Sequence, residues 1–274
     1  MRVYGHPHSP WVQAVLLGLH DRGIHCALKH TPPLSIFVRA GVMMPAAEKG
    51  EGGWQLESTA ILEDVGYQSI SESQMRDIRR AWIGLPHRID SGAVFWSNFS
   101  LTGQTEGSVG RRLASNFLRS FTVLYFHLLL SILRLSGQLR DPENYGNQFL
   151  PFEDKLKASG RPFLTGDAPE SLDCLLFGMI QSHCSTYVPP VEALQSDPRL
   201  ENVRAWISRM QERFCDYPYL YSAPYFRPHR LPPAPAGTFE RTAFWLGAIF
   251  WIGLFPITVP VILALALRNR LKDK

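Results

Sequence analysis

Hydrophobic and polar positions alternate differently along the first 70 residues, the middle and the end of the chain. In residues 1–70, short runs of alternating polarity predict strands, and apolar residues recurring every three to four positions predict helices. The predicted order is a strand at 2–5, a helix from Pro10 to Gly23, a strand at 25–30, a loop forced by Pro32 and Pro33, a hairpin of 42–47 and 54–56 around the KGEGG turn, and a helix opening at Glu57 and Ser58. This order predicts a small α/β sheet.

Strand signals end near residue 71, and helical periodicity takes over. The predicted helices lie at roughly 72–84, 109–136, 146–159, 170–184 and 199–214. The segment Phe121–Leu133 is very apolar, but its 13 residues between Arg119 and Arg134 are too few to cross a bilayer. We therefore expect it to be a buried helix of an all-α bundle.

The end of the chain carries a long uncharged segment. The 25 residues from Ala243 to Leu267 contain no charge, and a helix of about 20 apolar residues suffices to cross a bilayer core. Pro256 and Pro260 predict a kink in its middle. A single-pass transmembrane helix is the main prediction, and a shallow re-entrant hairpin is the alternative. Positive charge on both sides, at Arg241 and in the basic tail, leaves the orientation open.

Residues 216–241 are rich in proline and predict an extended, semi-rigid linker. The predicted organisation is an α/β domain at 1–70, an all-α domain at 71–215, the linker at 216–241, a transmembrane anchor at 242–268 and a basic tail at 269–274. We thus expect a protein held in a lipid bilayer through residues 243–267. Its body would be a soluble part on the cytoplasmic side of that membrane.

Composition narrows the partners. The formal charge is only +4, and no stripe of basic residues is interleaved with aromatic ones. Both observations argue against nucleic acid as a binding partner. The four cysteines form no CxxC pair or metal spacing, so we expect reduced thiols in a cytoplasm. His6 and His8 lack further ligands nearby, so no metal site is expected.

Four segments together resemble the glutathione S-transferase family over residues 1 to about 215. They are YGHPHSPWVQAVLLGL, VMMPAAEKGEGGWQLESTAILEDV, RPFLTGDAPESLDCLLFGMI and DPRLENVRAWISRM. The resemblance implies a thioredoxin-like N-terminal domain, an all-α C-terminal domain and glutathione as co-substrate. To this pattern the chain adds its C-terminal transmembrane segment.

The resemblance also implies which residues bind glutathione. Pro45 would follow a cis peptide that turns the Met44 backbone toward the cysteinyl part of the ligand. Glu57 and Ser58, at a helix start, would hold the γ-glutamyl end. The alternative for Glu57 or Ser58 is a purely structural role as helix cap. The short, Pro-interrupted segment after the second strand, where the family places further contacts, puts the affinity in doubt.

Ser9 is the candidate catalytic residue. It matches the Ser or Cys that precedes proline in the family's active-site motif, where a hydroxyl donates a hydrogen bond to the glutathione thiolate. The alternative is that Ser9 only caps the helix that starts at Pro10. Neither Ser9 nor Val12 is a cysteine, which argues against thiol–disulfide exchange.

Two functions follow from the resemblance. The first is a membrane-anchored transferase that promotes attack of glutathione on a small apolar electrophile. The resemblance also implies the homodimer that is common in the family. The second is a catalytically inactive binding or scaffold module tethered to a membrane. A pocket filled by Trp11, Met43 or Trp54 would favour the second.

Overall fold

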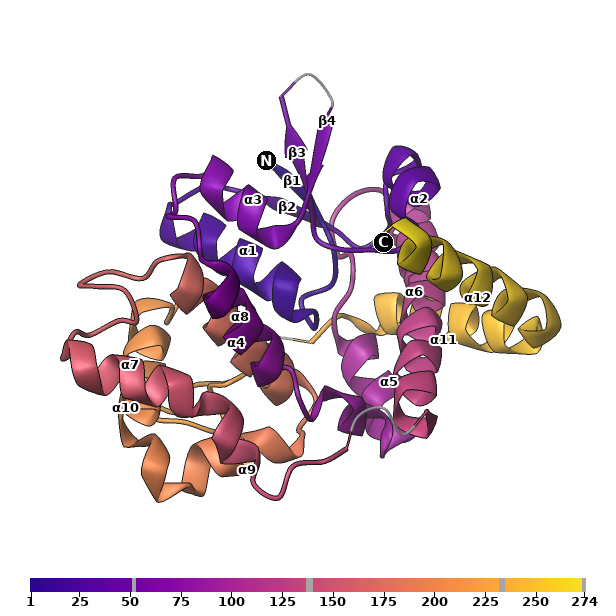
Figure 1. The fold of residues 1–274 in the computed structure, drawn as a ribbon. Helices are drawn as coiled ribbons and strands as arrows, with labels where there is room; N and C mark the ends of the chain where they lie inside the picture. The colour runs from indigo at the N-terminus through magenta and orange to yellow at the C-terminus, as the bar shows by residue number, and fades with distance from the viewer. Residues whose placement is uncertain (51–52, 137–139, 232–234, 273–274) are drawn as a thin grey trace.

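A four-stranded sheet forms the N-terminal part of the molecule (Figure 1). The computed structural model describes residues 1–50, 53–136, 140–231 and 235–272. The strands are β1 (Arg2–Tyr4), β2 (Ala27–Lys29), β3 (Ala46–Lys49) and β4 (Gly53–Leu56), in the order β2-β1-β3-β4. β1 is parallel to β2 and antiparallel to β3, and β3 and β4 form the predicted hairpin. The tip of that hairpin, residues 51–52, lies outside the described residues. With a helix after β1 and after β4, this is a thioredoxin-like α/β arrangement.

Helix α1 (Pro10–Asp21) begins as predicted, with proline at its first position, where the missing N–H costs nothing. It is buried between the sheet and α8 (Ser171–Ser185), as Figure 1 shows. A Cβ at Gly178 of α8 would lie 2.6 Å from the Pro10 carbonyl oxygen and 2.9 Å from the Ala14 nitrogen. The two helices therefore pack backbone against backbone, which holds the α/β part firmly on the helical part.

The segment after β2 differs from the predicted loop. Pro32 and Pro33 do interrupt the chain, but helix α2 (Leu34–Ala40) follows at once, with Pro33 as its N-cap residue. Proline is well suited to the start of a helix because its φ is already helical. The loop at Pro32 and Pro33 is therefore present, and the helix at 34–40 was not among the predicted elements.

After α3 (Ser58–Asp64) the described chain is helical, as the periodicity predicts. The five predicted helices correspond to α4 (Glu72–Ala81), α6 (Val109–Leu135), α7 (Leu150–Ser159), α8 and α10 (Glu201–Arg213). The structure adds α5 (Gly92–Leu101), α9 (Pro189–Ser196) and the short 3₁₀ turns η1 (Leu85–Ile89), η2 (Tyr145–Phe149) and η3 (Pro198–Leu200). An α/β domain followed by an all-helical domain, the predicted fold class for the body, is thus confirmed.

Helix α6 is longer than its apolar segment, and by length and composition alone it could cross a membrane. Its most apolar window is 44% buried within the molecule. Asn116, Arg119 and Ser120 are fully buried, and the helix packs against η1 and α11. These contacts place α6 in the helical body, where the sequence put it.

The predicted extended linker is instead folded onto the body over its first half. Tyr217, Leu220, Ala223 and Phe226 belong to the main hydrophobic core. The buried Ser222 accepts a hydrogen bond from Gln181 and donates one to Gln211, both at 2.8 Å. Aromatic residues alternate with the prolines here, and burying them outweighs the preference of a Pro-rich segment for an extended, solvated form. Residues 232–234 lie outside the described residues.

The C-terminal apolar segment forms two helices, α11 (Thr238–Gly253) and α12 (Phe255–Lys272), bent by 90°. The bend is at Leu254, just ahead of Pro256, while Pro260 lies inside α12. Thr258 donates its hydroxyl to the Trp251 carbonyl at 3.1 Å, which satisfies an acceptor freed by the break. The structure therefore does not support one straight span.

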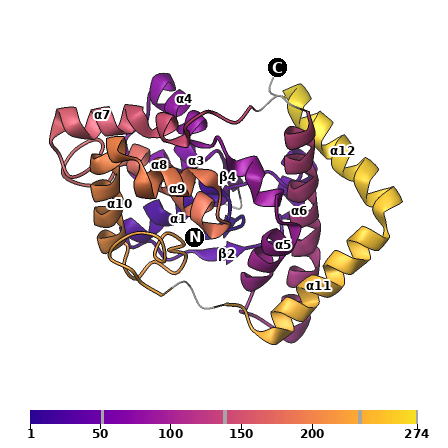
Figure 2. The same ribbon diagram turned by 90° about the horizontal axis from the view of Figure 1, so that it is seen from below.

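Both helices also return to the body (Figure 2). α11 lies along α6, where a Cβ at Gly247 would be 2.4 Å from the Phe117 carbonyl oxygen. Ile262 of α12 packs with Val42 and Leu124. The anchor predicted as a separate element is thus partly docked. Side chains of residues 265–274, including the basic tail, lie outside the described residues.

Candidate functional site

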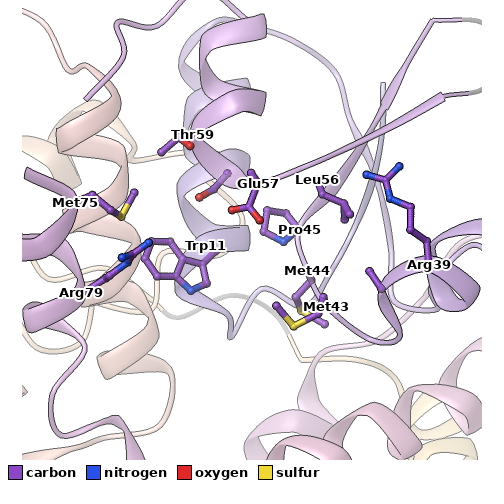
Figure 3. A pocket seen from close by; sticks show the side chains of 12 residues that line it. Trp11, Arg39, Met43, Met44, Pro45, Leu56, Glu57, Thr59, Met75 and Arg79 are labelled. Carbon is purple, nitrogen blue, oxygen red and sulfur yellow. The ribbon is translucent and has the colours of Figure 1, made fainter. Parts of the chain in front are cut away.

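A cleft of about 290 Å³ opens beside the start of α1 and the edge of the sheet (Figure 3). This volume is at the lower end of the range for small-molecule sites. Its lining comes from α1, α2, the segment before β3, β4, α3 and α4: Trp11, Arg39, Ala40, Met43, Met44, Pro45, Leu56, Glu57, Ser58, Thr59, Met75 and Arg79. Four of the five predicted site residues, Met44, Pro45, Glu57 and Ser58, therefore meet in one cavity.

The segment before β3 has the predicted backbone. The Met44–Pro45 peptide is cis. Pairing with β1 begins one residue later, at Ala46, so the Met44 backbone lies outside the ladder of the sheet. The Met44 sulfur accepts a hydrogen bond from the His6 backbone N–H at 3.3 Å, which ties this wall of the cleft to the loop after β1.

Glu57 has an unusual backbone. Its φ of 74° and ψ of 119° make it the one non-glycine residue with positive φ in the described part of the chain. Such a conformation costs about 1–3 kcal/mol and persists where the surrounding structure imposes it, often at ligand sites. Glu57 precedes α3 but makes no side-chain cap bond there. The purely structural alternative, that its carboxylate caps the helix, is therefore not what the structure adopts.

Two arginines of the cleft were missed by the sequence analysis. Arg39 at the end of α2 and Arg79 on α4 lie on opposite sides of it, with Glu57 between them (Figure 3). Arg39 lies in a helix that was not predicted, and Arg79 lies in the helix predicted at 72–84 without a role. Their shared position depends on the packing of α2 and α4 around the sheet edge, and no spacing in the sequence signals it.

Ser9 is not among the residues that line the cleft. It is the N-cap residue of α1, partly buried, with extended backbone and no side-chain cap bond. Its neighbour two positions on, Trp11, does line the cleft. The side chain that would act in catalysis thus lies beside the cleft, and its role stays a prediction.

Bulky residues do not fill this cavity. Trp11 and Met43 form part of its wall, and Trp54 lies elsewhere, with the Arg2 guanidinium 5.9 Å from its ring centroid. The plugged pocket expected of an inactive module is therefore not what the structure has. In the described ranges, no three His, Cys, Asp or Glu side chains gather as a metal site would require.

No protein-family model and no curated protein matches this chain. Among solved structures it is similar to Gtt2 from Saccharomyces cerevisiae, with 16% identity, a TM-score of 0.43, and coverage of 80% of this chain and 98% of that one. It is also similar to the theta class glutathione S-transferase from Xanthomonas axonopodis pv. citri with glutathione bound, with 15% identity, a TM-score of 0.40, and coverage of 81% and 94%. A third is FzlA from C. crescentus, with 16% identity, a TM-score of 0.45, and coverage of 87% and 97%.

Proposed function

We propose that this protein binds glutathione in the cleft between Arg39 and Arg79 and acts as a glutathione S-transferase-like protein. The observation that carries the proposal is the position of Glu57. Its backbone has positive φ, its side chain makes no cap bond to α3, and it lies in one cavity with Pro45, which follows a cis peptide. Strain of this kind is retained where a ligand needs the geometry.

The charges of the cleft match those of the ligand. Glutathione carries two carboxylates and one ammonium group at neutral pH. The two arginines on opposite sides suit the carboxylates, because a guanidinium pairs with a carboxylate through two hydrogen bonds. Glu57 suits the ammonium group, and the unpaired Met44 backbone can bind the cysteinyl peptide. The tripeptide would thus lie across the cleft from Arg39 to Arg79.

In the proposed reaction Ser9 donates a hydrogen bond to the glutathione thiolate and lowers the pKa of the bound thiol. The thiolate sulfur attacks the electrophilic carbon of a small apolar substrate and forms a C–S bond. The leaving group departs with the electrons of the bond that breaks. Ser9 is the N-cap residue of α1, two positions before Trp11, which lines the cleft.

The first experiment is calorimetric titration of the full chain, in detergent, with glutathione. We expect micromolar to low-millimolar affinity, weakened about tenfold in Arg79→Gln by loss of a charged pair. Arg76→Gln, one turn earlier on α4 and outside the lining, is the matched control and should bind normally. No binding by the folded wild-type chain would refute the proposal. Binding without turnover of any electrophile, unchanged in Ser9→Ala, would favour the inactive binding module.

We also propose that α11 and α12 attach the protein to a lipid bilayer. They expose large apolar side chains well beyond what a soluble surface carries in one place: Trp245, Leu246, Ile249, Phe250, Ile252, Phe255, Ile257, Val261 and Leu263. Flotation of the full chain with liposomes tests attachment, and resistance to alkaline extraction separates a spanning from a surface-bound form. Recovery of the chain with the aqueous fraction would contradict the proposal.

The body is proposed to lie on the cytoplasmic side of that membrane. Cys215 is the exposed thiol among the four cysteines. In intact cells, a membrane-impermeant maleimide should leave Cys215 unlabelled until the membrane is permeabilised. Labelling before permeabilisation would place the body on the other side.

A further inference from the structure

A group of buried nitrogen-rich side chains lies between the sheet and the helical domain, and none of them lines the cleft described above. His6 and His8 come from the loop after β1, His30 follows β2, Arg88 is in η1 and Arg119 is in α6. None is more than 4% exposed. The His6 and His30 rings stack with centroids 5.3 Å apart, and His8 stacks on Tyr221 at 5.1 Å. We call these five residues the buried basic cluster.

The two arginines have neutral partners. Arg88 donates to the carbonyl oxygens of His8 (3.2 Å) and Ser182 (2.8 Å) and to the Ser185 hydroxyl. Arg119 donates to the Phe99 carbonyl and, at 3.5 Å, to the Thr102 hydroxyl. In the part of the chain that the structure describes, no carboxylate forms an ion pair with either guanidinium.

Burying charge without a counter-charge is costly. Burial lowers the pKa of Arg119 to about 9 and that of Arg88 to about 10. It also lowers the pKa of His6 and His8 well below the usual range, and the nearby guanidiniums lower both further. At neutral pH the cluster therefore holds two positive charges and three neutral imidazoles.

The cluster also holds polar atoms without a partner. Arg88 Nε, Arg119 Nε and Nη2, and the Tyr221 hydroxyl are all buried and make no hydrogen bond to any residue that the structure describes. More than nine in ten buried polar groups in proteins have a partner. Unpaired donors beside two positive charges favour a negatively charged hydrogen-bond acceptor nearby, and of the residues that carry these four donors, Tyr221 lines a cavity.

A cavity of about 350 Å³ leads to this place. The polar part of its lining includes His8, Thr102, Ser185 and Tyr221. Arg88 donates a hydrogen bond to the Ser185 hydroxyl, and Arg119 donates one to the Thr102 hydroxyl. The rest of the wall is mainly apolar, with Leu101, Cys184, Pro224, Tyr225 and Pro235. It shares no lining residue with the glutathione cleft.

We propose that this second cavity binds a small organic carboxylic acid. The carboxylate accepts a hydrogen bond from the Tyr221 hydroxyl. The positive charges of Arg88 and Arg119, which bond to Ser185 and Thr102 of the lining, stabilise it. The hydrocarbon part of the ligand lies against Leu101, Pro224 and Pro235, which an inorganic anion would leave unfilled. The lining joins His8, in the loop after β1, to Leu101 at the end of α5 and Ser185 at the end of α8, so the bound acid would tie the α/β part to the helical part.

The test uses the full chain in detergent and four probes. Phenylacetate has the charge and the apolar body, phenylacetamide has the body without the charge, and acetate and inorganic phosphate have charge without the body. By calorimetry we expect phenylacetate to bind at least tenfold more tightly than each of the others. Equal binding of acid and amide, tighter binding of phosphate, or no binding of phenylacetate would overturn the proposal.

Variants locate the site. Tyr221→Phe removes one hydroxyl and should weaken phenylacetate binding about three- to tenfold, whereas Tyr187→Phe, an exposed tyrosine outside the lining, should not. Arg119→Gln should abolish binding; if that variant does not fold, Tyr221→Phe alone decides. Unchanged binding in Tyr221→Phe would overturn the assignment. Arg79→Gln, in the other cleft, should bind phenylacetate normally, which separates this site from the proposed glutathione site.

Discussion

Replacing Glu57 by glycine should stabilise the fold while it weakens glutathione binding. The backbone of Glu57, with φ 74° and ψ 119°, lies in a region that L side chains rarely adopt. That conformation costs about 1–3 kcal/mol for a residue with a Cβ and little for glycine. Against this gain, glycine makes the unfolded chain more flexible, which costs about 0.5–1 kcal/mol. The expected net change in unfolding free energy of Glu57→Gly is a gain of up to about 2 kcal/mol.

Glu57→Ala is the matched variant, because it removes the same carboxylate and keeps the Cβ. The main-chain bond from the Ile61 N–H to the Glu57 carbonyl, 3.1 Å, is available to both variants. The difference in stability between Gly and Ala therefore reports the relief of backbone strain less the greater flexibility that glycine gives the unfolded chain, and we expect Gly to be more stable by up to about 2 kcal/mol.

Urea denaturation followed by tryptophan fluorescence measures the stability, and calorimetry measures the affinity for glutathione. Both variants should lose affinity through the missing carboxylate. If Glu57→Gly is no more stable than Glu57→Ala, the strain at this position does not exist, and the main argument for a ligand site there fails. If both variants bind glutathione like the wild type, Glu57 does not contact it.

Three further predictions follow from the packing and the buried histidines. Burial lowers the pKa of His6, His8 and His30. Below pH 6.5 the unfolded chain therefore binds more protons than the folded one, and the free energy of unfolding should decrease as the pH is lowered, by about 1 kcal/mol per histidine at pH 5.5. Urea midpoints at pH 7.5 and 5.5 check this, and an unchanged midpoint would contradict it. Gly178→Ala should destabilise by at least about 2 kcal/mol because its Cβ meets the α1 backbone, whereas Gly110→Ala, with open space around it, should not; equal melting points would refute the close packing. Gly247→Leu should release α11 from α6 and expose Trp251 to an aqueous quencher, and Gly253→Leu is the control with no neighbour; unchanged quenching would show that α11 is not docked there.

Local patterns were sufficient for most elements. The helix beginning at Pro10, the hairpin and the helices after residue 71 depend on periodicity and on proline and glycine at their ends, which act over a few residues. The cis peptide before Pro45 and the turn at Glu57 and Ser58 came from the resemblance to a family. They lie in the cleft together because β3 and β4 are adjacent and consecutive in the chain.

Long-range packing decided the rest. The sequence pattern predicts a linker from Tyr217 to Phe226 because proline dominates it locally. These aromatic residues are nevertheless buried in the core with α1 and α8, which lie far away in sequence. Likewise, an uncharged run predicts a straight span by length alone, whereas the bend at Leu254 and the contact of Gly247 with Phe117 depend on the surface of α6.

Local patterns along the chain were enough to predict most strands and helices and the division into an α/β and a helical part, because each of these depends on neighbouring residues. The resemblance to a family supplied Met44, Pro45, Glu57 and Ser58, which lie together in one cleft. Only the tertiary structure placed Arg39 and Arg79 across that cleft and left Ser9 beside it. It alone also buried Arg88 and Arg119 beside three histidines, where no carboxylate among the described residues forms an ion pair with them. Charge and burial at such places are set by residues that meet only after folding, and no spacing along the chain encodes them.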